Sequence, residues 1–102
     1  MSDNTLIRIM EQNSGFDVVC SINHAKFKRL HDQPGYITRI RFDVNDSPVM
    51  QLDLGPNLPE NPVLGINLPS LEMNDRVSVI WNDTFGYKGN ASTSLATQLG
   101  SG

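Results

Sequence analysis

Apolar and polar residues alternate along much of the chain with a period of two, which is typical of strands that bury one face. The clearest run predicts a strand over residues 36–44, because only a strand with one dry and one wet side explains it well. Its apolar face comprises Tyr36, Thr38, Ile40, Phe42 and Val44. Its polar face comprises Arg39, Arg41 and Asp43.

Six other segments have strand character, and turn residues separate most of them. They cover residues 6–10, 16–22, 50–54, 64–68, 77–81 and about 87–95. Their predicted inward residues are Phe16, Val18, Cys20, Ile22, Met50, Leu52, Leu54, Leu64, Ile66, Leu68, Val77, Val79 and Trp81. We therefore predict an all-β, immunoglobulin-like β-sandwich of about seven antiparallel strands.

Residues 1–95 form one predicted domain, and residues 96–102 read as a frayed tail. The net charge of −3 argues against general nucleic-acid binding, which needs surplus Lys and Arg. No apolar run is long enough for a membrane helix, so we expect no membrane insertion. The first residues lack the pattern of a signal peptide, which leaves a cytoplasmic protein or one that a partner carries elsewhere.

Candidate chemistry is sparse. The chain has one cysteine, which excludes an intrachain disulfide framework. Cys20 and His24 lie roughly 13 Å apart in an extended strand, too far for a nucleophile and its base. Cys20 belongs to the apolar face, where burial would raise its thiol pKa. His24 and His31 lack the spacing of zinc ligands, so we expect no metal site. We also expect no cofactor and no catalytic residue.

The basic residues are unevenly placed. Five of the eight lie between residues 26 and 41, where Asp32 is the single acid. They are Lys26, Lys28, Arg29, Arg39 and Arg41. This cluster fits either a solvated face or a docking surface for an acidic partner or a small oxyanion.

Several short segments occur in an order that is typical of one family. They are 21–24 (SINH), 36–40 (YITRI), 44–49 (VNDSPV), 58–62 (LPENP), 74–83 (NDRVSVIWND) and Gly86. Over residues 5–95 the chain resembles SoxZ, a subunit of the periplasmic Sox system that oxidises thiosulfate. Residues 25–30 (AKFKRL) depart from the family pattern.

The resemblance implies an immunoglobulin-like, non-catalytic subunit that forms a heterodimer with SoxY. SoxY carries sulfur intermediates on the cysteine of a C-terminal Gly-Gly-Cys-Gly-Gly arm, and other Sox enzymes bind transiently to act on them. The sequence ends without such an arm, so we expect the SoxZ half of the pair. SoxZ is exported with SoxY, so the resemblance also implies a periplasmic protein.

The partner interface should use an exposed strand face or a sheet edge with an apolar centre. Candidate contacts lie around the 24–35 segment and before the strand at residue 64. They are His24, Phe27, Leu30, Arg39, Arg41, Asn61 and Pro62. Phe27 and Leu30 fit the end of the core equally well. Two alternatives stay open, a stand-alone immunoglobulin-like protein-binding module and a sulfur carrier that uses Cys20.

Overall fold

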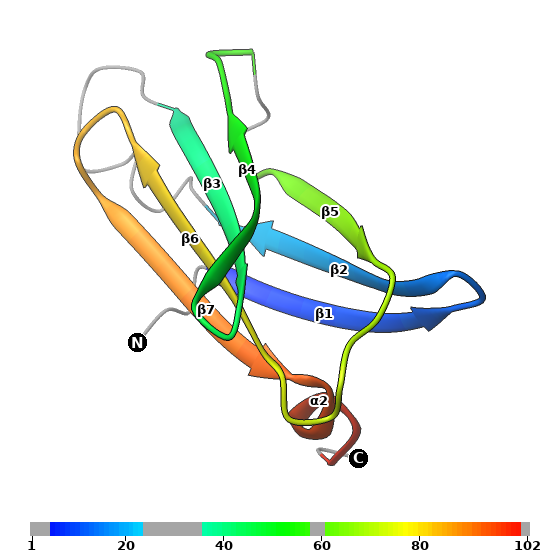
Figure 1. Cartoon of the computed structure of the whole chain (residues 1–102). Helices are drawn as coiled ribbons and strands as arrows, with labels where there is room; N and C mark the ends of the chain where they lie inside the picture. Colours follow the sequence, from blue (N-terminus) through cyan, green and yellow to red (C-terminus); the bar gives the residue numbers. More distant parts are fainter. Residues whose placement is uncertain (1–4, 24–35, 58–60, 101–102) are drawn as a thin grey trace.

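The structure is a computed structural model that describes residues 5–23, 36–57 and 61–100. In these ranges the chain forms seven strands and one short helix (Figure 1). Their bounds are β1 Thr5–Gln12, β2 Gly15–Ile22, β3 Ile37–Val44, β4 Ser47–Asp53, β5 Val63–Leu68, β6 Arg76–Asp83, β7 Lys88–Ser94 and α2 Leu95–Gly100. None of the helices in these ranges is long and apolar enough to cross a membrane.

The strands form two sheets, with the orders β1-β2-β5 and β4-β3-β6-β7, and every pairing is antiparallel. Three hairpins, β1–β2, β3–β4 and β6–β7, each stay within one sheet. The connections from β2 to β3, β4 to β5 and β5 to β6 pass from one sheet to the other. This arrangement confirms the predicted immunoglobulin-like β-sandwich.

The core lies between the sheets and uses the inward residues that the alternation predicts. On β6, Val77, Val79 and Trp81 are at most 1% exposed. Other buried apolar residues are Ile9, Val18, Cys20, Ile22, Ile37, Ile40, Phe42, Leu68 and Leu71. The Trp81 Nε1–H donates to Oγ1 of Thr5 over 2.9 Å, which joins β6 of one sheet to β1 of the other.

Gly89 provides the space that Trp81 needs. It lies opposite Trp81 in the β6–β7 register. A Cβ atom at Gly89 would lie 2.3 Å from Cε2 of the indole, closer than two non-bonded carbon atoms can approach. The buried indole ring of Trp81 on β6 therefore requires glycine at position 89 of β7.

The prediction for β3 is wrong at Asp43 and leaves out Ile37. Ile37 was not assigned to the core but is only 1% exposed, because the register with β6 shifts between Ile37 and Arg39. Asp43 is predicted on the solvated face but is only 4% exposed. It lies at a shift in the β3–β4 register, between Phe42 and Asp43, and it accepts two hydrogen bonds from Arg41. Tyr36 lies just before β3 and is half-buried. A shift in the register between neighbouring strands interrupts the alternation of inward and outward side chains along β3.

The β3–β4 turn is tighter than the 45–48 turn that the sequence predicts. Asn45 and Asp46 both have positive φ, 51° and 69°, as the central residues of a type I′ hairpin turn do. Pro48 therefore lies inside β4, where an edge strand tolerates it. Met50 was predicted to face inward but is 43% exposed, whereas Leu52 and Leu54 pack against the core.

A short helix replaces the frayed tail that we predicted from residue 96. Ser94 caps α2, since its Oγ accepts a hydrogen bond of 3.1 Å from the backbone N–H of Thr97. The N–H of Ala96 donates to the carbonyl of Met73 over 2.9 Å and fastens the helix to the β5–β6 connection. Residues 101–102 lie outside the described residues.

Candidate functional site

Cys20 is a core residue. It lies in β2, the central strand of its sheet, opposite Ile7 of β1 and Leu64 of β5. Its side chain is 1% exposed, and burial raises the pKa of its thiol to about 12. Both observations agree with the sequence prediction. A thiol that reacts as a thiolate needs solvent access and a lowered pKa, so Cys20 is unsuited to carry sulfur in the folded chain.

Three predicted contact residues, His24, Phe27 and Leu30, lie outside the described residues, as does His31. The predictions for them stay predictions. Among the residues that the structure does describe, no group of three or more His, Cys, Asp or Glu side chains could hold a metal ion.

Arg39 and Arg41 lie side by side on the outer face of the four-stranded sheet, as the alternation predicts. The Arg39 Nε–H donates to Oδ1 of Asp53 on β4 over 2.9 Å, and both side chains are exposed. Arg41 forms two hydrogen bonds with Asp43, from Nε to Oδ1 over 2.9 Å and from Nη2 to Oδ2 over 3.0 Å. Each arginine is therefore already paired with a carboxylate.

A shallow hollow separates these arginines from Lys88 of β7. Its volume is about 210 Å³. Its lining includes Arg39, Arg41, Gln51, Ile80, Asn82 and Lys88. Asp53 and Asp43 offset two of the three positive charges here, so little net positive charge remains to attract an oxyanion. This pairing favours a solvated face over an anion site.

Asn61 and Pro62 lie at the start of the other sheet, just before β5. Pro62 is buried, and its carbonyl accepts a hydrogen bond of 3.1 Å from the N–H of Ile22. Asn61 is exposed. Pro62 is thus part of the fold and has little surface to offer, and the structure does not bring this pair together with Arg39 and Arg41 on one face.

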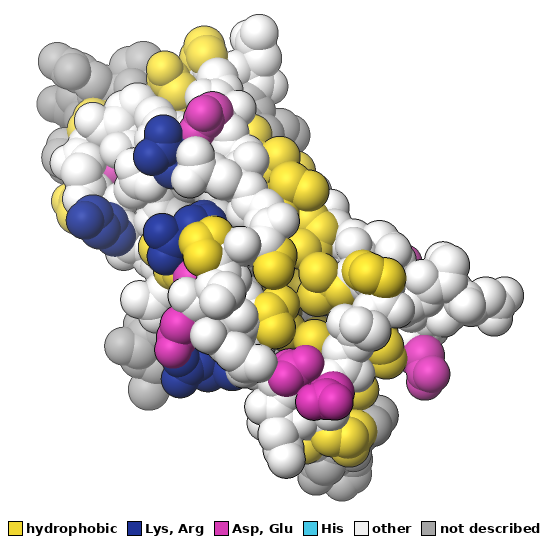
Figure 2. Space-filling model, in the orientation of Figure 1, with side chains coloured by type: hydrophobic (Ala, Val, Ile, Leu, Met, Phe, Trp, Pro, Cys, Tyr) yellow, Lys and Arg dark blue, Asp and Glu magenta, His cyan; other side chains and the backbone are white. Residues whose placement is uncertain are grey.

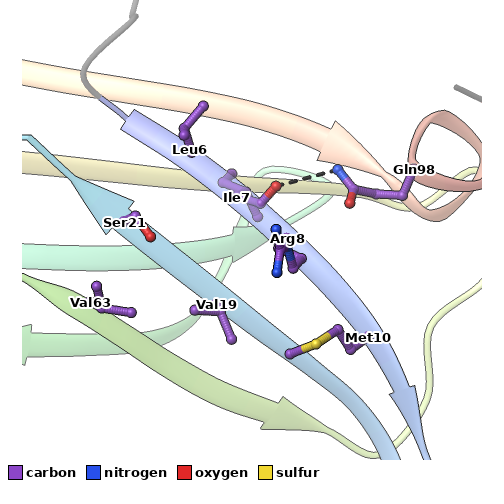
Figure 3. Close-up of a pocket in the computed structure, with 8 residues that line it drawn as sticks. All are labelled: Leu6, Ile7, Arg8, Met10, Val19, Ser21, Val63 and Gln98. Carbon is purple, nitrogen blue, oxygen red and sulfur yellow. Dashed lines mark hydrogen bonds between the residues drawn. The ribbon is translucent and has the colours of Figure 1, made fainter.

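The sequence predictions did not include the outer face of the three-stranded sheet, which exposes apolar side chains. Leu6 of β1 and Val63 of β5 are 67% and 64% exposed, with Ser21 of β2 between them. A pocket of about 420 Å³ lies on this face (Figure 3). Its lining comprises Leu6, Ile7, Arg8, Met10, Val19, Ser21, Val63 and Gln98. The sequence held a signal for this face, because Leu6 and Met10 of β1 are apolar at positions that alternate with the inward Ile9.

The sandwich is closed on one side and open on the other. β1 and β7 pack against each other, whereas β4 and β5 are not paired (Figure 1). At this open side, Leu52 and Leu54 near one edge and Leu64 and Ile66 near the other pack on the core but are only partly buried. Hydrophobic side chains form a continuous band between β4 and β5 (Figure 2).

A comparison with protein families identifies a family that covers most of the chain. The model of "Sulphur oxidation protein SoxZ" matches residues 11–94, which include β2 to β7 completely. A comparison with curated proteins yields no significant match.

Proposed function

The chain belongs to the SoxZ family, and on this basis we propose that it is a non-catalytic subunit that binds a SoxY-type sulfur carrier. In this role it helps to present the cysteine-bearing arm of the carrier to the other Sox enzymes during thiosulfate oxidation. The observation that carries the proposal is the family match over residues 11–94. Membership makes the chain a subunit of a sulfur-oxidation system.

The position of Cys20 supports a scaffold rather than a carrier. A carrier cysteine must meet several enzymes in turn, whereas Cys20 is 1% exposed in the middle of a sheet. Its raised thiol pKa, about 12, also keeps it protonated at neutral pH. The reactive thiol of the proposed complex therefore belongs to the carrier.

The proposal includes the compartment. The sulfur chemistry of the Sox system is periplasmic, so we place the chain there, together with its carrier. Fractionation of cells that make both proteins tests this placement. Recovery of the chain in the periplasmic fraction only when the carrier is present supports it, and an exclusively cytoplasmic chain contradicts it.

Co-purification tests the partnership. The chain and the SoxY-type carrier from the same organism are produced together, with an affinity tag on the carrier alone. We expect a stable complex with one copy of each. A chain that stays monomeric and shows no affinity for the carrier at micromolar concentrations overturns the proposal.

Reconstitution tests the role. Thiosulfate oxidation by the purified Sox enzymes is measured with the carrier alone, with the complex, and with a complex that contains Cys20→Ser. The scaffold role predicts activity that needs the chain and survives Cys20→Ser. Loss of sulfur loading in the Cys20→Ser complex, with the complex intact, would instead identify Cys20 as a carrier.

A further inference from the structure

The backbone directions of β5 follow from one hydrogen bond. The N–H of Ile22 donates to the carbonyl of Pro62, so residue 62 directs its backbone groups toward β2. In an antiparallel pair the direction alternates along the strand. Leu64 and Ile66, opposite Cys20 and Val18, therefore also face β2. Residues 63, 65 and 67 direct their N–H and C=O groups away from the sheet, along its free edge.

The free edge of β5 lacks the usual protection against pairing with another chain. Charged side chains, prolines and bulges normally protect such edges. The strand Val63–Leu68 (VLGINL) contains no charge and no proline, and its pairing with β2 has no register shift. It is an open stretch of six residues.

The other three edges are occupied or interrupted. On β1, the side chain of Gln98 donates from Nε2 to the carbonyl of Ile7 over 3.3 Å and accepts at Oε1 from the N–H of Ile9 over 3.5 Å. β7 packs beside β1. β4 contains Pro48 and faces a register shift between Phe42 and Asp43. Within the described ranges, β5 alone offers a regular edge.

The surroundings of this edge define what fits it. A strand added to β5 would continue the three-stranded sheet at the open side of the sandwich. Its inward side chains would lie beside Leu64 and Ile66, next to the apolar band toward β4 (Figure 2). Its outward side chains would lie beside Val63, Gly65 and Asn67. An uncharged extended segment with apolar residues at alternate positions satisfies both sides.

From these observations we infer that β5 is the docking edge of the chain, and that the SoxY-type carrier adds an extended segment there as a fourth strand. This inference rests on the proposed function and specifies its interface. It accounts for the exposed Val63 and the half-buried Leu64 and Ile66 together. It also places Asn61, one of the residues predicted from sequence, at the start of the interface.

Paired proline variants test the edge. Gly65→Pro removes the central outward N–H of β5, and a Cβ there meets only ordinary contacts, Val18 O at 3.4 Å and Val19 Cγ2 at 3.6 Å. Gln51→Pro is the matched control. The N–H of Leu54 donates to the carbonyl of Thr38, so residue 51 also faces away from its sheet, on β4. We expect Gly65→Pro to weaken carrier binding about tenfold or more and Gln51→Pro to leave it unchanged.

Hydrogen exchange of the wild-type chain gives a second measurement that needs no variant. The amides of residues 63, 65 and 67 should exchange quickly in the free chain and roughly tenfold or more slowly in the complex. The amides of Leu64 and Ile66 should be protected in both states, which gives an alternating pattern along β5.

The outcomes separate the two proposals. If the wild-type complex forms but the outward amides stay unprotected, or Gly65→Pro binds as wild type does, the β5 inference is wrong and the proposed function stands. If no complex forms, the proposed function fails, and the inference fails with it. Protection of the same amides in a homodimer of the free chain shows that a second copy occupies the edge and also overturns the inference.

Discussion

Cys20 shows how one position can decide between functions. A cysteine thiol on a mobile arm could carry sulfur. Cys20 instead lies in the central strand β2, where it packs as a small apolar core residue. Burial stabilises the protonated form, so unfolding must make deprotonation easier. The thiol therefore links the free energy of unfolding to pH.

The sign of this linkage can be tested. The thiol pKa is about 12 in the folded chain against its ordinary value of 9.0, so the folded state keeps its proton to higher pH. The contribution of Cys20 to stability is complete below pH 9.0 and is lost as pH rises toward 12. From pH 8 to pH 10 the wild type should lose about 1.4 kcal/mol more than Cys20→Ala. Urea unfolding of both proteins measures this difference, and parallel losses would contradict it.

Alkylation of Cys20 is a separate test at the same residue. Because the thiol is 1% exposed, iodoacetamide at pH 8 should label the native chain only as fast as it unfolds. Labelling in 6 M urea should be rapid and serves as the control. Mass spectrometry follows the modified fraction, and rapid labelling of the native chain would show that the buried position is wrong.

Gly89 is the second residue that the packing fixes. Gly89→Ala places a methyl group 2.3 Å from the Trp81 ring, so the ring or the strand must move. We expect a loss of about 2–3 kcal/mol in the free energy of unfolding. Gly55→Ala is the matched control, because nothing lies within 4 Å of its added Cβ. Equal stability of the two variants would contradict the packing argument.

At the scale of elements, α2 protects the edge of β1. Its Gln98 side chain bonds the backbone of Ile7 and Ile9 as a neighbouring strand would. Gln98→Ala should therefore speed hydrogen exchange at the Ile9 amide by about fivefold or more, since one hydrogen bond is worth about 1 kcal/mol. The Val18 amide, inside the sheet, is the internal control. An unchanged rate at Ile9 would show that Gln98 does not protect the edge.

The elements also show what the sequence could predict. Most of the seven strands follow from the period of two, which is a local property of each segment, whereas β7 shows it only weakly. The burial of Ile37 and Asp43 does not follow from that period, because both residues lie at register shifts that depend on the neighbouring strands. The helix α2 was missed because six residues are too few for a helical period, although Ser94 is a recognisable cap.

The candidate site was less predictable for the same reason. The common face of Arg39 and Arg41 follows from alternation, but their pairing with Asp53 and Asp43 depends on geometry that periodicity does not give. The free edge of β5 depends on the sheet order β1-β2-β5, which joins segments far apart in the sequence. Local patterns do not encode that order.

At the scale of the whole molecule, the two candidate surfaces predict different effects of salt on binding. The surface around Arg39 and Arg41 carries charged side chains, whereas the edge strand β5 carries none. Docking on β5 should change the Kd for the carrier less than about threefold between 50 and 500 mM NaCl. Isothermal titration calorimetry at the two salt concentrations measures this Kd. A loss of affinity of about tenfold or more would point to the charged face instead.

The hydrogen bond between Trp81 and Thr5 has a consequence for folding. It joins residues 76 positions apart and forms only when the two sheets meet. Trp81 is the single tryptophan of the chain, so its fluorescence is an intrinsic reporter of that event. The three hairpins can form locally before the indole leaves water, and sandwiches of this kind close in milliseconds to seconds. Stopped-flow emission should therefore record the docking of the sheets rather than the formation of the strands.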